Sequence, residues 1–353
     1  AIMSGKTHSP NVAPILSRRE LLARSGIGFG MLGLTGVMAS DGALVRAAEG
    51  ATSGGLAPRA GHFLGKAKRV VHLFMNGGPS QVDTFDPKPL LDKYHGQPLP
   101  SSLRTERKTG ALMKSPFSFT RYGKSGLEVS EIFPHVGSCA DDICVIRSMQ
   151  TDIPNHEPSL LMMNSGNMQP IRPSLGSWLT FGLGTENQDL PGYVVLCPGK
   201  PVVGPQLWSN SFLPGVYQGT FVDSKHERVD RLIENIRNPD TTPDRQRRQL
   251  DLLRRINEQH REARPPDAAL EARIESFELA FRMQREAAEA FDVTREPRYA
   301  RDLYGPGVHA RQLLIARRLV ERGVRFVQLW HGASQPWDDH ADILNHRKLA
   351  GEC

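Results

Sequence analysis

Residues that can bind an anion, hold a metal or transfer a proton are concentrated in three short stretches of this chain. The first is Asn76-Gly77-Gly78-Pro79-Ser80, where flexible glycines and a hydroxyl can hold an anion or a metal. The second contains His156 in the polar loop 151–159, where an imidazole can be a ligand, a general base or a nucleophile. The third ends in Trp337-Asp338-Asp339-His340, and carboxylate and imidazole groups are common metal ligands.

Apolar, β-branched runs precede all three stretches and predict the elements that position them. These runs span residues 69–75, 142–149 and 324–330, and each is typical of a buried strand in a parallel sheet. Ligands of such sheets bind at the carboxyl ends of the strands, so the three loops are expected to form one site. The alternative for the first loop is an ordinary turn in which Asp83 caps the next helix.

The remainder of the chain predicts supporting structure. Residues 182–222 are rich in Gly, Pro, Asn and Trp and indicate a loop insertion, either at a substrate pocket or on the surface. Residues 243–291 carry apolar positions at helical spacing and predict a helical hairpin with a solvated charged face. An amphipathic helix is expected from Leu313 to Arg322, ending at Gly323.

The N-terminus has the layout of a bacterial twin-arginine export signal. Arg18 and Arg19 precede a weakly apolar, glycine-rich stretch, and small residues follow up to position 48. We therefore expect a signal over residues 1–48, a linker over 49–65 and one domain over 66–353. The twin-arginine translocase would be a partner, and the protein would be periplasmic or secreted. The stretch is too polar for a stable transmembrane span.

Composition excludes other classes of protein. Among 353 residues the formal charge is +6, but removing residues 1–48 leaves 39 basic against 36 acidic residues, a net charge of +3. That charge, without a basic stripe, argues against nucleic-acid binding. Four cysteines are too few for a disulfide framework. Cys139 and Cys144 are interpreted first as buried small residues and second as a disulfide.

Together these motifs closely resemble the DUF-1501 family, which is abundant in planctomycete-type bacteria and related to sulfatases and alkaline phosphatases. The resemblance covers about residues 15–353 and rests on the signal and on residues 76–89, 155–158 and 337–340. It implies an alkaline-phosphatase-like, three-layer α/β/α fold with a mostly parallel sheet. In that superfamily Asp and His side chains hold one or two divalent metals, while a Ser, Thr or Cys attacks a sulfate or phosphate ester.

The resemblance also assigns roles to residues of this chain. Asn76 occupies the place of a metal-binding Asp in the superfamily and is a weaker ligand. His156 aligns with the sulfatase nucleophile but is no formylglycine precursor. The candidates are His156, Ser80 and Asn155 for catalysis, Gly77, Gly78, Ser80 and Gln81 for anion binding, and Asp83, Asp338, His340 and His331 for a divalent metal (Zn, Ca, Mg or Mn). Asp342 and His346, at i,i+4 spacing, are lesser metal candidates.

Family members continue beyond the point at which this chain ends, so the sheet is expected to be incomplete at its C-terminus. Two functions fit the sequence. The first is an exported, metal-dependent hydrolase of sulfate or phosphate esters on a small molecule or polysaccharide. The alternative is a non-catalytic, exported binding or surface protein that keeps the same fold.

Overall fold

The computed structural model describes residues 55–353, apart from residues 64, 103–104, 106–107, 152, 234–235, 237–239 and 263–267. The predicted export signal with Arg18 and Arg19 lies outside the described residues, as do residues 49–54 of the expected linker. Residues 55–353 cluster as a unit separate from residues 1–54. None of the described helices has the length and apolar composition needed to cross a membrane.

The described residues form both strands and helices. The strands are β1 (Val70–Phe74), β2 (Phe119–Tyr122), β3 (Leu127–Ser130), β4 (Tyr193–Cys197), β5 (Thr220–Asp223) and β6 (Phe326–Trp330). The helices are α3 (Pro89–Lys93), α4 (Pro134–Ser138), α5 (His156–Ser165), α6 (Leu175–Leu183), α7 (Val229–Leu232), α8 (Pro243–Glu262), α9 (Ala268–Ala290), α10 (Arg298–Tyr304), α11 (Val308–Glu321) and α12 (His346–Gly351).

Four parallel strands form the central sheet in the order β1–β6–β4–β5. Strands β4 and β6 are buried along their whole length, as expected for apolar strands covered on both faces. Strand β1 is one of the two edge strands of the described sheet, and its Val71 and Leu73 remain exposed. The expectation of a mixed α/β chain with a mostly parallel sheet is confirmed.

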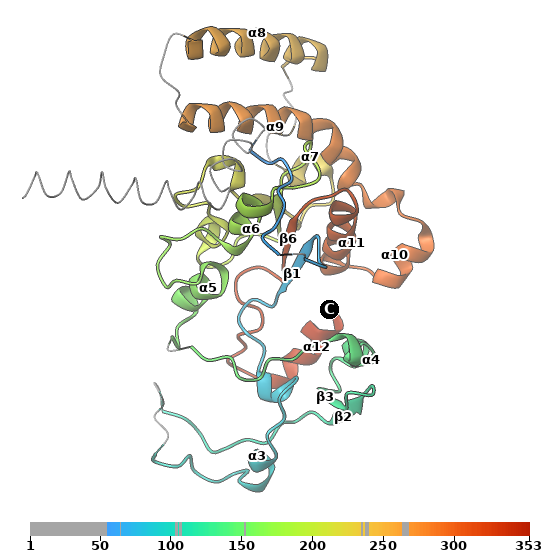
Figure 1. Cartoon of the computed structure of the whole chain (residues 1–353). Coiled ribbons are helices and arrows are strands. Elements are labelled where there is room, and N and C mark those ends of the chain that lie inside the picture. Colours follow the sequence, from blue (N-terminus) through green and yellow to red (C-terminus); the bar gives the residue numbers. More distant parts are fainter. Residues whose placement is uncertain are drawn as a thin grey trace, which may run out of the picture. The chain divides into compact units, whose positions relative to one another are not determined.

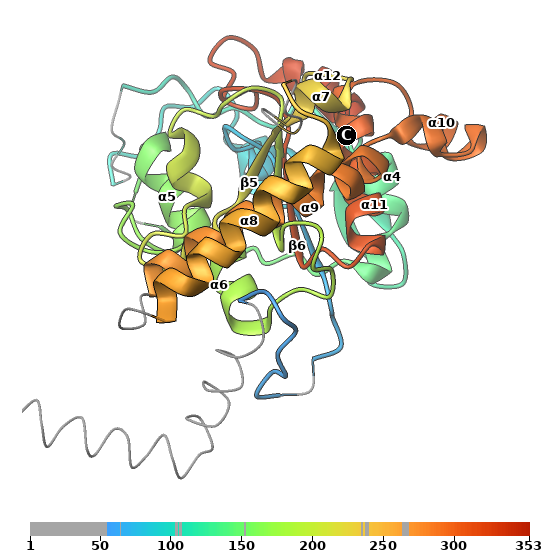
Figure 2. The same cartoon turned by 90° about the horizontal axis from the view of Figure 1, so that it is seen from above.

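Helices pack on both faces of this sheet (Figures 1 and 2). On one face, α9 and α11 enclose an apolar cluster that includes Val327 and Leu329 of β6. On the other face, α5 and α6 enclose a second cluster that includes Phe326 and Trp330 of the same strand. Because successive side chains of a strand point to opposite faces, β6 belongs to both cores.

A third, smaller core stands beyond the carboxyl end of the sheet. It joins the antiparallel pair β2–β3 and helices α4 and α12 around Trp337, which is 1% exposed. Burial of this indole fixes the loop that leaves β6, because a buried aromatic side chain contributes several kcal/mol that a displaced loop would lose, roughly 3–5 by truncation.

Residues 142–149 do not form the strand that the sequence predicts. Asp142 ends a short 3-10 turn, and residues 143–149 continue as irregular chain with Ile143, Ile146 and Met149 exposed. Arg147 attaches this segment to the loop after β1 through Asp86, with an Nε–Oδ1 distance of 3.7 Å. A β-rich sequence forms a strand only where a neighbouring strand pairs with it, and no described strand does so here.

Two further expectations differ from the structure. Residues 182–222, expected as a loop insertion, contain β4 and most of β5, two of the four strands of the central sheet. Cys139 and Cys144 are exposed free thiols, so neither burial nor a disulfide describes them. The helices expected between 243 and 291 and at 313–322 are α8 with α9, and α11.

Candidate functional site

The loops that follow β1 and β6 lie against each other at the carboxyl end of the sheet. The backbone nitrogen of Trp337 donates a hydrogen bond to the carbonyl of Asn76 at 3.0 Å. A Cβ on Gly77 would lie 2.5 Å from the backbone nitrogen of Asp338, so only glycine permits this approach. Two of the three polar stretches are thereby brought into direct contact.

The third stretch reaches the same place, where Asp338 joins two histidines. Nε2 of His156 lies 2.8 Å from Asp338 Oδ2, and Nε2 of His340 lies 3.0 Å from Asp338 Oδ1. The exposed fractions of the side chains, 39% for His156, 27% for Asp338 and 69% for His340, leave the group open to a ligand. Three of the sequence-predicted site residues therefore converge.

His156 is the first residue of α5, and this position determines its electrostatic surroundings. The preceding Asn155 occupies the N-cap position in extended conformation, but its side chain makes no capping hydrogen bond. The first backbone N–H groups of a helix have no partner within it and carry partial positive charge. His156 thus stands at a helix terminus that favours an anion.

A buried polar network holds α5 on the sheet. The hydroxyl of Tyr193 donates to Gln328 Oε1 at 2.6 Å, and Gln328 Nε2 donates to Asn164 Oδ1 at 2.6 Å. All three side chains are almost fully buried, and Asn164 belongs to the last turn of α5. Strands β4 and β6 therefore fix the helix that carries His156.

Asp83 belongs to a separate, buried group. Its Oδ2 accepts a hydrogen bond from Ser80 Oγ at 2.5 Å, and the backbone nitrogen of Ser80 donates to His346 Nε2 at 3.4 Å. Asp83 is 5% and His346 2% exposed. The short 3-10 turn at residues 81–83 directs the Asp83 carboxylate back to Ser80 and so accounts for this pairing.

The amides expected to bind an anion after β1 are partly engaged within the protein. Gly78 N donates to the carbonyl of Met75 at 3.3 Å, and Ser80 N is directed to His346. Both Gly77 and Gly78 adopt positive φ, which gives the tight turn its shape, and Gln81 is exposed at the start of the next turn. These residues position the loop in the described structure.

Asn76, near the site, has a buried side-chain amide without a hydrogen-bond partner among the described residues. It is fully buried, and neither its Oδ1 nor its Nδ2 has a hydrogen-bond partner among the described residues. An unpaired buried amide costs free energy, of the order of 1–3 kcal/mol, and in native proteins usually has a functional or structural reason.

His331, a candidate metal ligand, has a structural position. It is 2% exposed, and its Nδ1 accepts a hydrogen bond from Trp337 Nε1 at 2.8 Å. Burial, together with the charge of the neighbouring His309, lowers the pKa of His331 to about 4. The neutral imidazole fixes the Trp337 ring, and through it the loop that carries Asp338.

Acidification is expected to destabilise the protein through His331. Its pKa is about 4 when folded and about 6.5 when unfolded, so the unfolded state binds more protons between these values. The free energy of unfolding should therefore fall as the pH drops from 6.5 towards 4, by up to about 3 kcal/mol. Denaturant unfolding at pH 7, 5.5 and 4.5 measures this loss.

The matched control is a second histidine on a neighbouring element. His331→Gln keeps an acceptor for Trp337 and should show a smaller pH slope than the wild type. His135→Gln, at an exposed position of α4, should keep the wild-type slope. Equal slopes for His331→Gln and the wild type would refute the assignment.

The four expected metal ligands do not form one centre. Asp338 contacts His340, whereas Asp83 is hydrogen-bonded to Ser80. His331 is hydrogen-bonded to the Trp337 indole. Within the described ranges, no group of three or more His, Cys, Asp or Glu side chains is arranged to hold a metal ion. The residues present do not fit the implied metal as a ready-made site.

Some contributors to the site gave little signal in the sequence. The sequence indicates Trp337 only as part of a polar loop. In the structure its indole packs in the small core and donates a hydrogen bond to His331, and so holds that loop in place. His309, whose ring centroid lies 4.7 Å from that of His331, gave no signal because it is a lone histidine at the start of α11. Asp342 does not pair with His346 but accepts a hydrogen bond from Leu344 N at 2.9 Å.

Comparison with known proteins agrees with the motifs that meet in this site. A family model described as a protein of unknown function, DUF1501, matches residues 67–352, which include all three polar loops. Searches of curated proteins and of solved structures gave no match. Since the family model covers well over half of its length, this chain belongs to the DUF1501 family.

Proposed function

We propose that this protein is an exported hydrolase of sulfate or phosphate esters, in which His156 acts on the substrate and Asp338 positions His156. The observation that supports it most is the 2.8 Å contact between His156 Nε2 and Asp338 Oδ2 at the head of α5. A carboxylate that accepts one imidazole N–H fixes the tautomer and stabilises the imidazolium that forms during catalysis.

This pairing assigns the chemistry to the other ring nitrogen. With Nε2–H donated to Asp338, Nδ1 of His156 is the basic atom. Nδ1 attacks the phosphorus or sulfur atom, the ester oxygen leaves with its electron pair and takes a proton from water, and a second water cleaves the N–P or N–S bond. In the alternative, Nδ1 removes a proton from the water that attacks the ester.

The substrate's negative charge has a place in this proposal. The backbone amides of His156 and Glu157, at the start of α5, offer two donors and partial positive charge. The next residue, Pro158, has no N–H to add. His340 Nε2 contacts the other oxygen of the Asp338 carboxylate, and in its imidazolium form His340 can donate Nδ1–H to an ester oxygen. Stabilising charge that develops in the transition state is commonly the largest catalytic contribution.

The wider features of the resemblance are part of the same proposal. They are an alkaline-phosphatase-like topology, export by the twin-arginine translocase to the periplasm or medium, and a sulfated or phosphorylated small molecule or polysaccharide as substrate. A divalent cation (Zn, Ca, Mg or Mn) is not included in the proposed mechanism, because the described side chains do not form a site for it. Elemental analysis of the purified full-length protein tests for it directly.

The decisive experiment assays p-nitrophenyl sulfate and p-nitrophenyl phosphate with the purified protein. We expect nitrophenol to be released from one of these esters. The same activity should be found in the periplasmic or secreted fraction, and it should be absent from that fraction when Arg18 and Arg19 are both changed to lysine. Sulfate or phosphate binding without turnover would instead favour the non-catalytic binding protein. Turnover in the cytoplasm alone would overturn the assigned location.

A further inference from the structure

The helical hairpin formed by α8 and α9 has apolar surface that the rest of the described chain leaves uncovered. Helix α9 packs one side against the sheet through buried Leu279, Met283 and Ala287. Helix α8 lies on the outer side of α9, and none of its described side chains, residues 244–260, is fully buried (Figure 1). In proteins most of a helix's stability comes from packing of an apolar face, and the described part of α8 has no fully buried residue to provide it.

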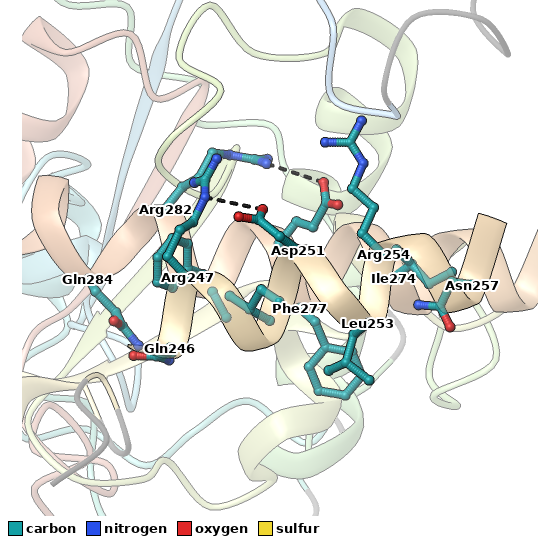
Figure 3. A pocket seen from close by; sticks show the side chains of 14 residues that line it. Gln246, Arg247, Asp251, Leu253, Arg254, Asn257, Ile274, Phe277, Arg282 and Gln284 are labelled. Atoms are coloured by element: carbon teal, nitrogen blue, oxygen red, sulfur yellow. Dashed lines mark ion pairs between the residues drawn. The ribbon is translucent and has the colours of Figure 1, made fainter. Parts of the chain in front are cut away.

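The two helices also do not close against each other. A cleft of about 500 Å³ lies between them, and its lining includes Leu250 and Leu253 of α8 and Ile274 and Phe281 of α9. Figure 3 shows Leu253 and Ile274 among the side chains that line it. The guanidinium of Arg247 stacks over the Phe281 ring at 5.7 Å. The hairpin therefore resembles two helices of a four-helix bundle without the other two helices that would pack against them.

A second apolar pair lies on α8 outside the residues that line this cleft. Leu252 and Ile256 are four residues apart and so share one helix face, and neither lines the cleft. They are 59% and 50% exposed. Leu253, 53% exposed, borders the same face. Contiguous exposed apolar residues of this kind on a helix usually mark an interaction surface.

The charges of the two helices identify the occupant. Helix α8 has six arginines and four carboxylates, a net charge of +2, whereas α9 has five glutamates and three arginines, a net charge of −2. A hairpin with one positive and one negative helix is complementary to itself after a two-fold rotation, which sets α8 of each copy against α9 of the other. A membrane or nucleic acid would match α8 alone and be repelled by α9.

We infer that two copies of this chain associate through their α8–α9 hairpins and form a four-helix bundle. Two adjacent helices about 30 Å long and each about 10 Å wide present a face of roughly 600 Å². Accessible surface exceeds this flat area, so the face approaches the roughly 800 Å² per partner of a stable complex. The predominantly antiparallel packing of such bundles suits a hairpin pair.

The test measures the oligomeric state of the full-length protein by sedimentation equilibrium, with the double variant Leu252→Gln/Ile256→Gln. The wild type should sediment at twice the mass of one chain, and the variant should have a dimer dissociation constant roughly a hundredfold higher or more. Both positions are half exposed in the single chain, so the variant should keep its helical circular dichroism.

The matched control places the same kind of change on another exposed apolar surface. Tyr299 and Leu303 of α10 are 74% and 81% exposed, and Tyr299→Gln/Leu303→Gln should remain dimeric. A monomeric wild type, a hairpin variant as dimeric as the control, or a monomer that binds anionic phosphatidylglycerol vesicles through α8 would each overturn the inference. None of these outcomes depends on ester hydrolysis.

Discussion

Replacing His156 with alanine is expected to lower kcat for ester hydrolysis by about 10²–10⁴-fold, the range for loss of a positioned acid–base group. The change removes Nδ1, the atom assigned to the substrate, and leaves Asp338 paired with His340. His156 is partly exposed at the start of α5, so the fold should survive. Steady-state kinetics on p-nitrophenyl esters, with added imidazole as a test of chemical rescue, measure the effect.

The matched control is His226→Ala. His226 Nε2 lies 3.8 Å from Asp223 Oδ2 and the side chain is 40% exposed, so it repeats the histidine–carboxylate arrangement beside β5, at the opposite edge of the sheet from β1. Its loss should leave kcat within about twofold of the wild type. Asp338→Asn separates geometry from charge, because the amide oxygen still accepts from Nε2 but cannot stabilise the imidazolium. Near-wild-type turnover in His156→Ala would move the reaction to another place on the molecule.

The meeting of the polar loops follows from a property that the sequence reveals. Residues 324–330 form a continuous apolar run, and such runs become central strands of parallel sheets. Because β1 and β6 are parallel neighbours, the loops that follow them begin at the same end of the sheet. Gly77 and Asp338 therefore lie next to each other. His156 reaches them although the strand expected before it is missing, since α5 is held on the sheet by Asn164 and Gln328.

Other features depended on contacts that a single sequence does not encode locally. Residues 193–197 and 220–223 are short strands between many turn residues, so composition concealed their central position in the sheet. Residues 142–149 have strand-like composition, but pairing depends on tertiary context rather than on propensity. Asp83 accepts a hydrogen bond from Ser80 instead of joining Asp338, and nothing in the local sequence indicates this pairing.

Burial around the site also depends on tertiary packing. His331 and His340 flank one loop and look equivalent in sequence, yet the first is 2% exposed and the second is open to solvent. Trp337 causes this difference, because its indole fills the small core and hydrogen-bonds His331 from inside. The anchoring of the site to the rest of the protein is therefore encoded in packing around one aromatic residue.

Gly77→Ala is expected to damage stability and catalysis together. Gly77 has φ of +101°, and a Cβ there would lie 2.5 Å from Asp338 N and 2.9 Å from the carbonyl oxygen of Gln335, both backbone atoms that cannot rotate away. Backbone strain and overpacking should together lower the free energy of unfolding by about 3 kcal/mol and Tm by roughly 5–10 °C. Displacing Asp338 by about 1 Å should also cost about 10²-fold in turnover.

Gly78→Ala isolates the steric part of this prediction. Gly78 has a similar positive φ of +77°, but no heavy atom lies within 4 Å of the position that a Cβ would take, so strain of about 1–2 kcal/mol is the only expected cost. Differential scanning calorimetry and ester kinetics on the two alanine variants therefore compare strain alone with strain plus collision. If both variants have the same Tm and the same activity, the loops after β1 and β6 are not in contact at Gly77. The alignment of Asp338 with His156 would then have another origin.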